Sequence, residues 1–360
     1  MGKRTVIPFG PQHPILPEPV HLDLVIEDEK VIEAIPSIGF IHRGLEKLAE
    51  VREYPEMVYV IERICGICSF GHGLGYVTAV EGLMGVEVPE RADYLRTMWH
   101  EMSRIHSHML WLGLTADSFG FESLFMHTWK VRERIMNMFD LTTGGRVIHS
   151  VCKVGGVRKD VGGEMLERIA SEVRDIRKET KELTKVFLND TSVKNRLCGV
   201  GILSEDDARD LCAVGPVARA SGINQDLRLN GMCKYGELGF EPVTGKSGDC
   251  YARCKVRILE LGQSLDMVEK ITSVLPDGPV EVPVKGPLPT GEFMMRLEQP
   301  RGEAFYYVKG NGTKHLERMR VRTPTNMNLP SMVRMLQGCD LADVPVIILT
   351  IDPCISCTER

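Results

Sequence analysis

The sequence predicts an α+β fold that is mainly α, with a central bundle of long helices and a small antiparallel β-sheet at the N-terminus. Three observations lead to this fold class. Apolar residues recur every three or four positions over several long segments, apolar and polar residues alternate within the first forty positions, and 43% of the 360 residues are hydrophobic. We therefore expect a single domain over residues 1–360. Its parts are a β element at 1–40, a helix bundle at 45–275 and a loop-rich part at 276–360 that closes the functional site.

The β element is expected as a hairpin. Residues 20–26 (VHLDLVI) alternate between apolar and polar side chains, which is typical of a strand with one buried face. Residues 27–30 (EDEK) offer a turn, and residues 31–35 (VIEAI) are again suited to a strand.

The bundle is expected from four segments with a period of three to four residues, opened by Pro89 at the start of the first. These segments cover about residues 89–112, 122–141, 163–188 and 249–275. The segment around Cys65 is a candidate fifth helix. Residues 276–330 are rich in Pro and Gly, and we expect functional loops with short strands there. The apolar run 344–351 (VPVIILTI) is expected to be a buried strand.

Composition excludes several classes of protein. The net charge is −5 and acids and bases are interspersed, so the basic stripe of a nucleic-acid binder is missing. The N-terminal residues have no apolar segment typical of a secretory signal, and the run 344–351 is too short to span a bilayer. Eleven cysteines, an odd number, indicate free thiols in a reducing compartment. We expect a chain that is soluble by itself but can be a peripheral subunit of a membrane complex.

Two C-x-x-C pairs carry the chemistry of this chain: Cys65 with Cys68, and Cys354 with Cys357 near the other end. Structural zinc sites usually take both pairs from within about twenty residues, and a thioredoxin-like redox pair needs a βαβ context. Four thiolates would suit nickel, iron or zinc, and their softness alone does not choose among these metals. If a helix continues past Cys68, His72 faces the same side and its N–H can donate to a thiolate sulfur.

The segments RICGIC and DPCISC, together with His72, resemble the large subunit of [NiFe] hydrogenases, and the resemblance covers nearly the whole chain. The segments GPQHP (10–14), HRGLEKL (42–48) and the residues from Leu114 onward are also similar to the quinone-site, 49-kDa subunit of respiratory complex I. Sequences with both likenesses are typical of energy-converting, membrane-bound hydrogenases of the Ech type. The complex I subunit lacks the paired cysteines, which makes these cysteines the discriminating feature.

The resemblance implies the [NiFe] hydrogenase large-subunit fold and an Ni–Fe(CO)(CN)₂ centre. Cys65 and Cys354 would be terminal nickel ligands, while Cys68 and Cys357 would bridge nickel and iron. A second group of residues would surround the metals without ligating them: a hydrogen-bond donor to a bridging thiolate (His72), the walls of the pocket for the diatomic ligands (Pro300 and Arg301), a hydroxyl donor to cyanide (Thr325) and an ion-pair partner of Arg301 (Asp352).

Heterolytic cleavage of H₂ needs a proton acceptor near the metal. The resemblance selects the Cys354 thiolate, with Arg301 as an alternative, followed by Glu18 as the next carboxylate. Glu46 corresponds to a ligand of an accessory Mg or Fe ion, but this chain has Arg360 where many relatives have a histidine. An ion pair between Glu46 and Arg360 is the open alternative.

Further expectations concern two residues and the C-terminus. His13 and Asp117 match positions at the quinone end of complex I and are either part of a proton path or structural polar groups. The chain ends three residues after Cys357, which fits either a processed tail or a chain made without one.

The remaining seven cysteines form no cluster-binding array, so electrons must leave through a partner. The implied partners are a small subunit with a [4Fe–4S] cluster, ferredoxin-type and other complex I-like subunits, integral membrane subunits and, indirectly, ferredoxin. The chain is expected at the cytoplasmic face of the membrane, with H₂ chemistry coupled to ion translocation. Two alternatives remain open: a hydrogenase module fed by formate or CO oxidation, and a non-catalytic, complex I-like coupling subunit with a structural metal.

Overall fold

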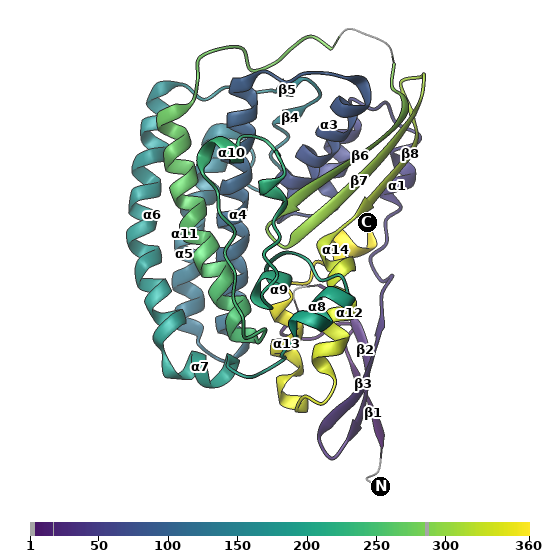
Figure 1. Cartoon of the computed structure of the whole chain (residues 1–360), viewed down its shortest axis with the longest axis vertical. Helices are drawn as coiled ribbons and strands as arrows, with labels where there is room; N and C mark the ends of the chain where they lie inside the picture. Colours follow the sequence, from purple (N-terminus) through teal and green to yellow (C-terminus); the bar gives the residue numbers. More distant parts are fainter. Residues whose placement is uncertain (1–3, 17, 285–287) are drawn as a thin grey trace.

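The computed structural model describes residues 4–16, 18–284 and 288–360. Its architecture is a bundle of long helices packed beside a second layer of sheet and shorter helices, with both layers sharing one hydrophobic core (Figure 1). The mainly helical α+β fold class predicted from the sequence is confirmed. None of the helices in the described ranges is long and apolar enough to cross a membrane.

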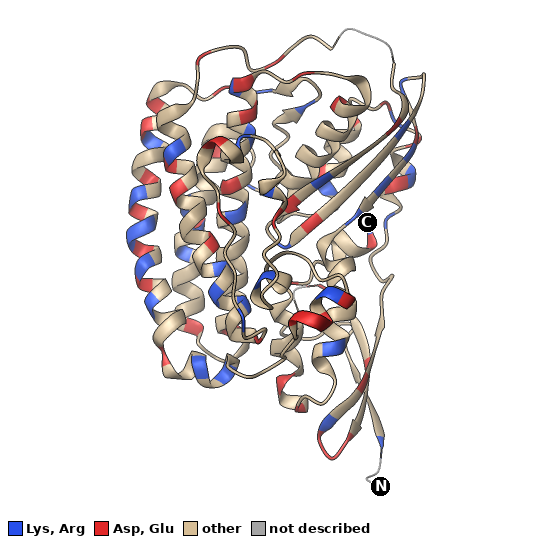
Figure 2. Cartoon of the chain, in the orientation of Figure 1, with Lys and Arg blue, Asp and Glu red and all other residues tan. Residues whose placement is uncertain are grey.

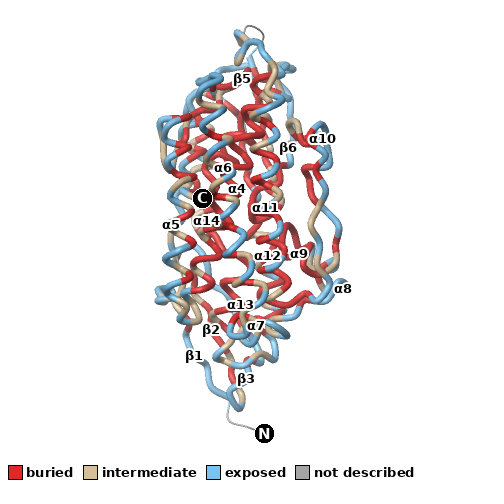
Figure 3. The backbone as a smooth tube through the Cα atoms, turned by 90° about the vertical axis from the view of Figure 1, so that its left-hand side faces the viewer, coloured by how far each residue is buried: buried red, intermediate tan, exposed pale blue. Residues whose placement is uncertain are grey.

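The bundle consists of α4 (Glu90–Ser118), α5 (Glu122–Thr143), α6 (Gly163–Asn189) and α11 (Cys250–Val274). Their bounds agree with the expected segments, although α4 extends six residues beyond the expected end. Helix α4 packs against both α5 and α11, and most of its positions are buried, so it occupies the centre of the molecule (Figures 1 and 3). Helix α6 buries one stripe only, and acidic and basic residues alternate on its outer face (Figure 2).

Local sequence explains where these helices begin and end. Helix α4 starts directly after Pro89, whose extended ψ of 144° precedes the first helical residue. Helix α5 stops at Gly144, which adopts a left-handed φ of 80°. Helix α11 is capped by Asp249, whose carboxylate accepts a hydrogen bond from the amide of Ala252 at 2.7 Å.

The N-terminal sheet contains β1 (Thr5–Phe9), β2 (His21–Glu27) and β3 (Lys30–Ser37) in the order β1-β2-β3, all antiparallel. The predicted hairpin is present, with Glu27 paired to Lys30 at its end. Alternate residues of β2 are buried, which explains the alternation in the sequence.

The expectation of loops with short strands between residues 276 and 330 is wrong for residues 290–322. This segment forms a second antiparallel sheet of β6 (Thr290–Gln299), β7 (Gly302–Asn311) and β8 (Leu316–Arg322). The Pro and Gly residues lie mainly at the strand ends: Pro289 precedes β6, Pro300 lies in the β6–β7 turn and Pro324 begins α12 (Pro324–Leu336). The turn-forming residues therefore delimit the strands instead of interrupting them.

The expected buried strand at 344–351 is also wrong, because residues Val344–Thr350 form the helix α13. Pro345 lies in the first turn of α13, where the N–H that proline lacks would have no partner within the helix. Six of the seven residues of α13 are buried, so the helix has no polar face that would reveal the helical period in the sequence.

The remaining helices are short, apart from α3 (Ser69–Met84), which packs on the second sheet. The other elements are α1 (Leu45–Leu48), α2 (Met57–Ile61), η1 (Glu62–Ile64), β4 (Cys152–Lys153), β5 (Gly156–Val157), α7 (Thr191–Leu197), α8 (Glu205–Asp210), α9 (Gly215–Ala220), η2 (Leu227–Leu229), α10 (Tyr235–Leu238), η3 (Leu341–Asp343) and α14 (Ile355–Glu359).

Candidate metal centre

The fold brings the two C-x-x-C pairs together although 289 positions separate matching cysteines. Cys65 and Cys68 flank the junction of η1 and α3, whereas Cys354 and Cys357 lie at the start of α14 and within it. The Sγ–Sγ distances are 3.3 Å for Cys68–Cys357, 3.4 Å for Cys65–Cys354 and 2.9 Å for Cys354–Cys357. All four side chains are buried. Within the described ranges they are the only group of three or more His, Cys, Asp or Glu residues that could hold a metal.

Four thiols this close cannot all ionise without a cation. Hydrogen bonds from the neighbouring thiols, those of Cys354 foremost, lower the pKa of Cys65 well below the usual range and that of Cys68 to about 6. Burial raises the pKa of Cys354 and Cys357 well above the usual range. The protein alone therefore shares protons among the four sulfurs, and a divalent metal would be needed to hold them all as thiolates.

Arg301 and Asp352 form a buried ion pair beside the cysteines. Arg301 lies in the β6–β7 turn, and its Nε donates to Asp352 Oδ1 at 2.9 Å and to the Asp352 carbonyl oxygen at 3.0 Å. Asp352 itself has a left-handed φ of 58°, two residues before Cys354. Arg301 Nη1 and Asp352 Oδ2 are buried and have no hydrogen-bond partner among the described residues. This guanidinium therefore retains an N–H donor that nothing in the described chain accepts.

A cavity of about 340 Å³ lies against Arg301, Asp352, Cys65 and Cys354. The rest of its wall is mostly apolar, with the larger side chains supplied by Ile67, Leu110, Leu114, Trp129 and Leu349. Four buried soft donors, an unpartnered guanidinium N–H and adjacent apolar space fit a metal centre that carries small anionic ligands. Pro300 is buried in the same turn as Arg301 but does not line this cavity.

Thr325, in the first turn of α12, contacts the second cysteine pair. Its Oγ1 accepts a hydrogen bond from the backbone N–H of Cys354 at 3.0 Å, and its side chain is buried. The hydroxyl proton of Thr325 is not used in this bond and remains available for an acceptor at the centre.

His72 contacts the expected kind of partner, the sulfur of a predicted bridging cysteine. Its Nε2 lies 3.3 Å from Cys357 Sγ, so the partner is Cys357 and not Cys68 of its own segment. Its Nδ1 lies 2.9 Å from the Tyr306 hydroxyl, which accepts from Gln299 Nε2 at 3.0 Å. If Tyr306 donates its single proton to Nδ1, His72 carries its own proton on Nε2, from which it can donate to the sulfur.

Gln299 and Tyr306 were not identified from the sequence as neighbours of His72, although the glycines of α3 indicate that side chains approach this helix closely. The glycines of α3 mark close approaches: a Cβ on Gly75 would lie 2.2 Å from the Tyr306 ring, and a Cβ on Gly71 would lie 3.2 Å from Gln299. Glycines spaced through one helix indicate that another element approaches its backbone, but they do not say which element.

Glu18 lies next to the second cysteine pair. Its Oε2 accepts hydrogen bonds from the backbone amides of Ile355 and Ser356, the latter at 3.1 Å. Glu18 lines both the cavity that holds Cys65 and Cys354 and a second cavity of about 520 Å³ that is lined by residues 11–14, Leu16 and Pro19. The carboxylate therefore stands between the cysteines and the second cavity.

His13 and Asp117, the two polar residues of uncertain role in the sequence, lie apart from each other. His13 lines the second cavity beside Glu18, and its ring stacks on Phe9 at a centroid distance of 4.1 Å. Asp117 is exposed near the C-terminal end of α4 and lines neither cavity. The fold therefore groups His13, but not Asp117, with Glu18.

Glu46 forms ion pairs with arginine side chains, which was the alternative to binding an accessory metal ion. Its Oε1 accepts from Arg360 Nε at 2.9 Å and from the amide of Val321 at 2.9 Å, and its Oε2 accepts from Arg320 Nη1 at 2.8 Å. Burial opposes the ionised form, but these partners outweigh it and lower the pKa of Glu46. Because cations and an amide already bind both carboxylate oxygens, the geometry favours this ion pair over the expected Mg or Fe ion at Glu46.

Two family models match the chain. The model described as respiratory-chain NADH dehydrogenase, 49 Kd subunit, matches residues 118–286 and 284–360, and the model described as nickel-dependent hydrogenase matches residues 43–114. The first C-x-x-C pair lies in the hydrogenase match and the second in the NADH dehydrogenase match.

Individual relatives cover almost the whole chain. The membrane-bound hydrogenase subunit alpha of Pyrococcus furiosus is 38% identical over 98% of this chain and 87% of its own length. The carbon monoxide-induced hydrogenase of Rhodospirillum rubrum is 36% identical over 98% of this chain and 99% of its own length. A chain of the membrane-bound sulfane sulfur reductase, an archaeal respiratory membrane complex, is 31% identical with a TM-score of 0.94, over 99% of this chain and 98% of that one. Two of these names describe hydrogenases and one describes a sulfane sulfur reductase, so kinship alone does not select a reaction.

Proposed function

The chain belongs to the family that unites nickel-dependent hydrogenases with the 49-kDa subunit of respiratory-chain NADH dehydrogenase, and we propose that within it this chain is the catalytic large subunit of a [NiFe] hydrogenase. The reaction is 2H⁺ + 2e⁻ ⇌ H₂. The observation that carries the proposal is the buried group of four thiols beside Arg301, whose Nη1 has no partner among the described residues.

The cysteines would hold the two metals. Cys65 and Cys354 are proposed as terminal nickel ligands, and Cys68 and Cys357 as bridges between nickel and iron. An Ni–Fe(CO)(CN)₂ centre, when bound, supplies the redox chemistry of H₂. Arg301 would donate its free Nη1 proton to a cyanide, and the Thr325 hydroxyl would donate to the other, because each has an unused N–H or O–H beside the cysteines. Pro300 would support this binding only indirectly, by shaping the turn that carries Arg301.

A proton would leave from Cys354 Sγ, with Arg301 as the alternative first base, and reach Glu18 next. The contact of Glu18 with the amides of Ile355 and Ser356 supports this order, because it holds the carboxylate beside Cys354. From Glu18 the proton would enter the second cavity, where His13 is the titratable side chain in reach. A role for Asp117 would require another route, since Asp117 lines neither cavity.

Electrons would leave through a partner, because the four thiols are the only candidate metal site among residues 4–16, 18–284 and 288–360. The proposed partners are a small subunit with a [4Fe–4S] cluster, ferredoxin-type and complex I-like subunits, and integral membrane subunits. In an energy-converting complex of the Ech type, ferredoxin would exchange the electrons at the cytoplasmic face and the membrane subunits would couple the reaction to ion translocation. The names of relatives that describe membrane-bound complexes support this assembly.

Infrared spectroscopy of the purified complex, together with metal analysis, tests the proposal. We expect stretching bands of CO and cyanide and one nickel per copy of this chain. A Cys68→Ser variant, which removes one bridging sulfur, should lose the bands while the chain stays folded. Zinc in the four thiolates without CO or cyanide bands would instead establish the non-catalytic, complex I-like subunit. Formate- or CO-linked partners in the same complex would identify the hydrogenase as a module of such a system.

A further inference from the structure

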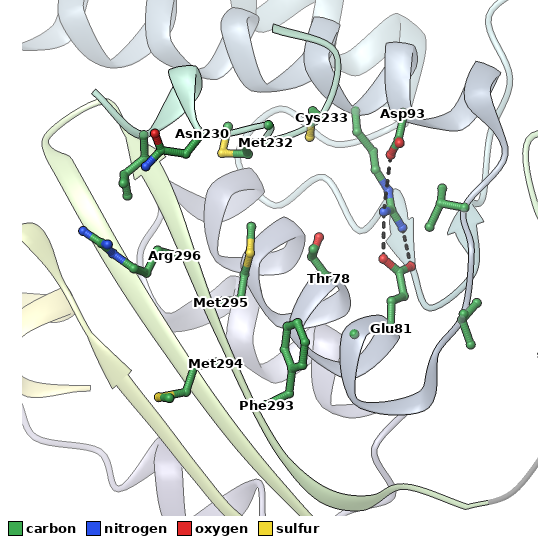
Figure 4. Close-up of a pocket in the computed structure, with 16 residues that line it drawn as sticks. Thr78, Glu81, Asp93, Asn230, Met232, Cys233, Phe293, Met294, Met295 and Arg296 are labelled. Atoms are coloured by element: carbon green, nitrogen blue, oxygen red, sulfur yellow. Dashed lines mark hydrogen bonds and ion pairs between the residues drawn. The ribbon is translucent and has the colours of Figure 1, made fainter. Parts of the chain in front are cut away.

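A cavity of about 530 Å³ lies outside the metal centre, between α3, the first turns of α4, the loop at residues 230–233 and β6 (Figure 4). We call it the β6 pocket. Three residues of its polar floor come from the helices: Glu81 of α3, and Asp93 and Arg96 of α4. None of these residues has a part in the proposed hydrogen chemistry, so the pocket requires its own explanation.

The three floor residues carry a net charge of −1, because Arg96 faces both Glu81 and Asp93; Arg296, which also lines the pocket, is paired with Glu303. Arg96 donates to both oxygens of Glu81, at 2.9 and 2.7 Å, and to the carbonyl oxygens of Lys153 and Gly156, so this buried pair is neutral and largely saturated. Asp93 lies 3.9 Å from Arg96 Nη1, too far for a hydrogen bond. Figure 4 shows this longer ion pair with Arg96. In the described ranges the Asp93 carboxylate accepts no hydrogen bond, and 30% of the side chain is exposed. Burial raises the pKa of Asp93, and the charge of Arg96, which is shared with Glu81, offsets this only in part.

The wall of the β6 pocket is apolar. Phe293 and Met295 face it from β6, and Met232 faces it from the opposite loop (Figure 4). Phe293 packs against Gly82, where a Cβ would lie 2.3 Å from the ring. Met294, on the next position of the strand, is 65% exposed. A ligand that fits this wall and the floor has a cationic head and an aliphatic body, which is the chemistry of a lysine or arginine side chain.

The strand beside the pocket has a free edge. β6 is the first strand in the order β6-β7-β8, so none of the described strands pairs with its outer side. Gln299 pairs with Gly302 across the two-residue turn. In an antiparallel pair the backbone N–H and C=O groups of alternate residues face the partner strand, so those of Gln299 and of every second residue before it bond to β7. The backbone groups of Glu298 and of every second residue before it point to the outer side. The outward carbonyl oxygen of Glu298 already accepts a hydrogen bond from Arg104 Nη2 at 2.8 Å. The outward groups of Glu292, Met294 and Arg296 remain open to a further strand.

We propose that an extended segment of a partner subunit adds to the outer edge of β6 and places a lysine or arginine side chain in the β6 pocket against Asp93. The edge supplies backbone hydrogen bonds, and the pocket supplies the selection for a basic residue. This docking surface is independent of the proposed reaction, because it uses no residue of the metal centre. The same docking surface would serve if the chain were a non-catalytic, complex I-like subunit.

Photo-crosslinking in the purified complex tests this docking surface. A benzoylphenylalanine at Met294 should crosslink to one partner subunit, in a segment that carries a lysine or arginine. The same probe at Met126 of α5, which is 60% exposed, is the matched control. In an Asp93→Lys background the Met294 crosslink should fall about tenfold, equivalent to about 1.4 kcal/mol, and the Met126 product should not change. Asp93→Asn, which keeps the size of the side chain, should give an intermediate loss.

Hydrogen exchange gives a second readout that does not depend on any variant. The amides of Glu292, Met294 and Arg296 should exchange about tenfold more slowly in the complex than in the separate chain, whereas those of Phe293 and Met295, already bonded to β7, should change little. The proposal is overturned if Met294 crosslinks only within this chain or to a second copy of it. It is equally overturned by a crosslinked segment without a basic residue, by a crosslink that Asp93→Lys leaves unchanged, or by equal exchange in the two states.

Discussion

Glu18 illustrates how one side chain can connect two environments. Its carboxylate accepts from the backbone amides that follow Cys354, and it lines both the cavity beside Cys65 and Cys354 and the cavity of His13. We expect Glu18→Gln to lower H₂ turnover by about 10²–10⁴-fold, because the amide cannot accept a proton. Nickel and iron contents should stay at the wild-type level. Glu33→Gln, an exposed residue of β3, is the control. Full turnover in Glu18→Gln would remove Glu18 from the proton path.

Tyr306 is a positioning residue that acts through His72. Its hydroxyl lies 2.9 Å from His72 Nδ1, and a proton donated there would leave the proton of His72 on Nε2, which faces Cys357. We expect Tyr306→Phe to shift the infrared bands of the bound diatomic ligands and to reduce turnover by about tenfold, since hydrogen bonding to a metal-bound sulfur tunes the metal. Tyr307→Phe, whose side chain points to the other face of β7, should do neither. Unchanged bands in Tyr306→Phe would show that the tautomer of His72 is set elsewhere.

At the scale of elements, α3 and the second sheet are held together by a close approach at Gly75. A Cβ there would lie 2.2 Å from the Tyr306 ring, so Gly75→Ala forces the helix away from β7. We expect a loss of about 1–3 kcal/mol in the free energy of unfolding, measured by denaturant titration. Gly262→Ala in α11, where nothing lies within 4 Å of the new Cβ, should be neutral or stabilising. Equal effects of the two substitutions would contradict the packing argument.

The C-terminal helix α14 is held to the N-terminal part of the chain by the ion pair of Glu46 with Arg360. Glu46→Gln should cost about 1–3 kcal/mol near pH 7. The pKa of Glu46 is lowered in the folded protein, so this stabilisation is present above its unfolded value near 4.5 and is lost as the pH falls through the folded value. The difference in melting temperature between wild type and Glu46→Gln should therefore shrink below about pH 4.5.

Metal analysis distinguishes the ion pair from an accessory ion at Glu46. The ion pair predicts that Glu46→Gln keeps the metal content of the wild type. Loss of one Mg or Fe per chain in this variant would restore the accessory ion as the role of Glu46.

At the scale of the whole molecule, a buried set of charges joins the helix bundle to the second sheet. Arg219 of α9 binds Glu260 of α11 at 2.8 Å, Glu298 of β6 at 2.8 Å and Asp226 at 3.0 Å, and these side chains are almost entirely buried. We expect Arg219→Met to lower the free energy of unfolding by about 3–5 kcal/mol, because it leaves buried carboxylates without their cation. Arg209→Met, which removes an exposed ion pair of α8, should cost less than about 1 kcal/mol.

Burial in this network also affects how Glu298 titrates. Desolvation and the nearby Asp226 raise the pKa of Glu298 to about 7. In Arg219→Met the main neighbouring cation is lost, so Glu298 should take up a proton at a higher pH than in the wild type. If Arg219→Met and the wild type had the same free energy of unfolding at neutral pH, the network would have no structural role.

The local features of the fold could be predicted from the sequence. The bundle helices follow from a period of three to four residues and from stops such as Gly144, and the first hairpin follows from alternation around residues 27–30. The length of β6 could not be predicted, because exposed residues fill both faces of its first half and hide its alternation. The helix α13 was missed for a related reason, since burial on nearly all sides removes the helical period.

The sequence by itself determined the fold class, the bounds of the long helices and the two cysteine pairs, because periodicity and motif spacing are properties of neighbouring residues. Only the tertiary structure decided what surrounds those cysteines. It joined pairs 289 positions apart, set Gln299 and Tyr306 behind His72 and satisfied Glu46 with Arg360. It also left Asp93 with only a long ion pair to Arg96, beside a free strand edge. These contacts join residues far apart in the chain, and local sequence patterns do not encode which distant groups the packed core brings together.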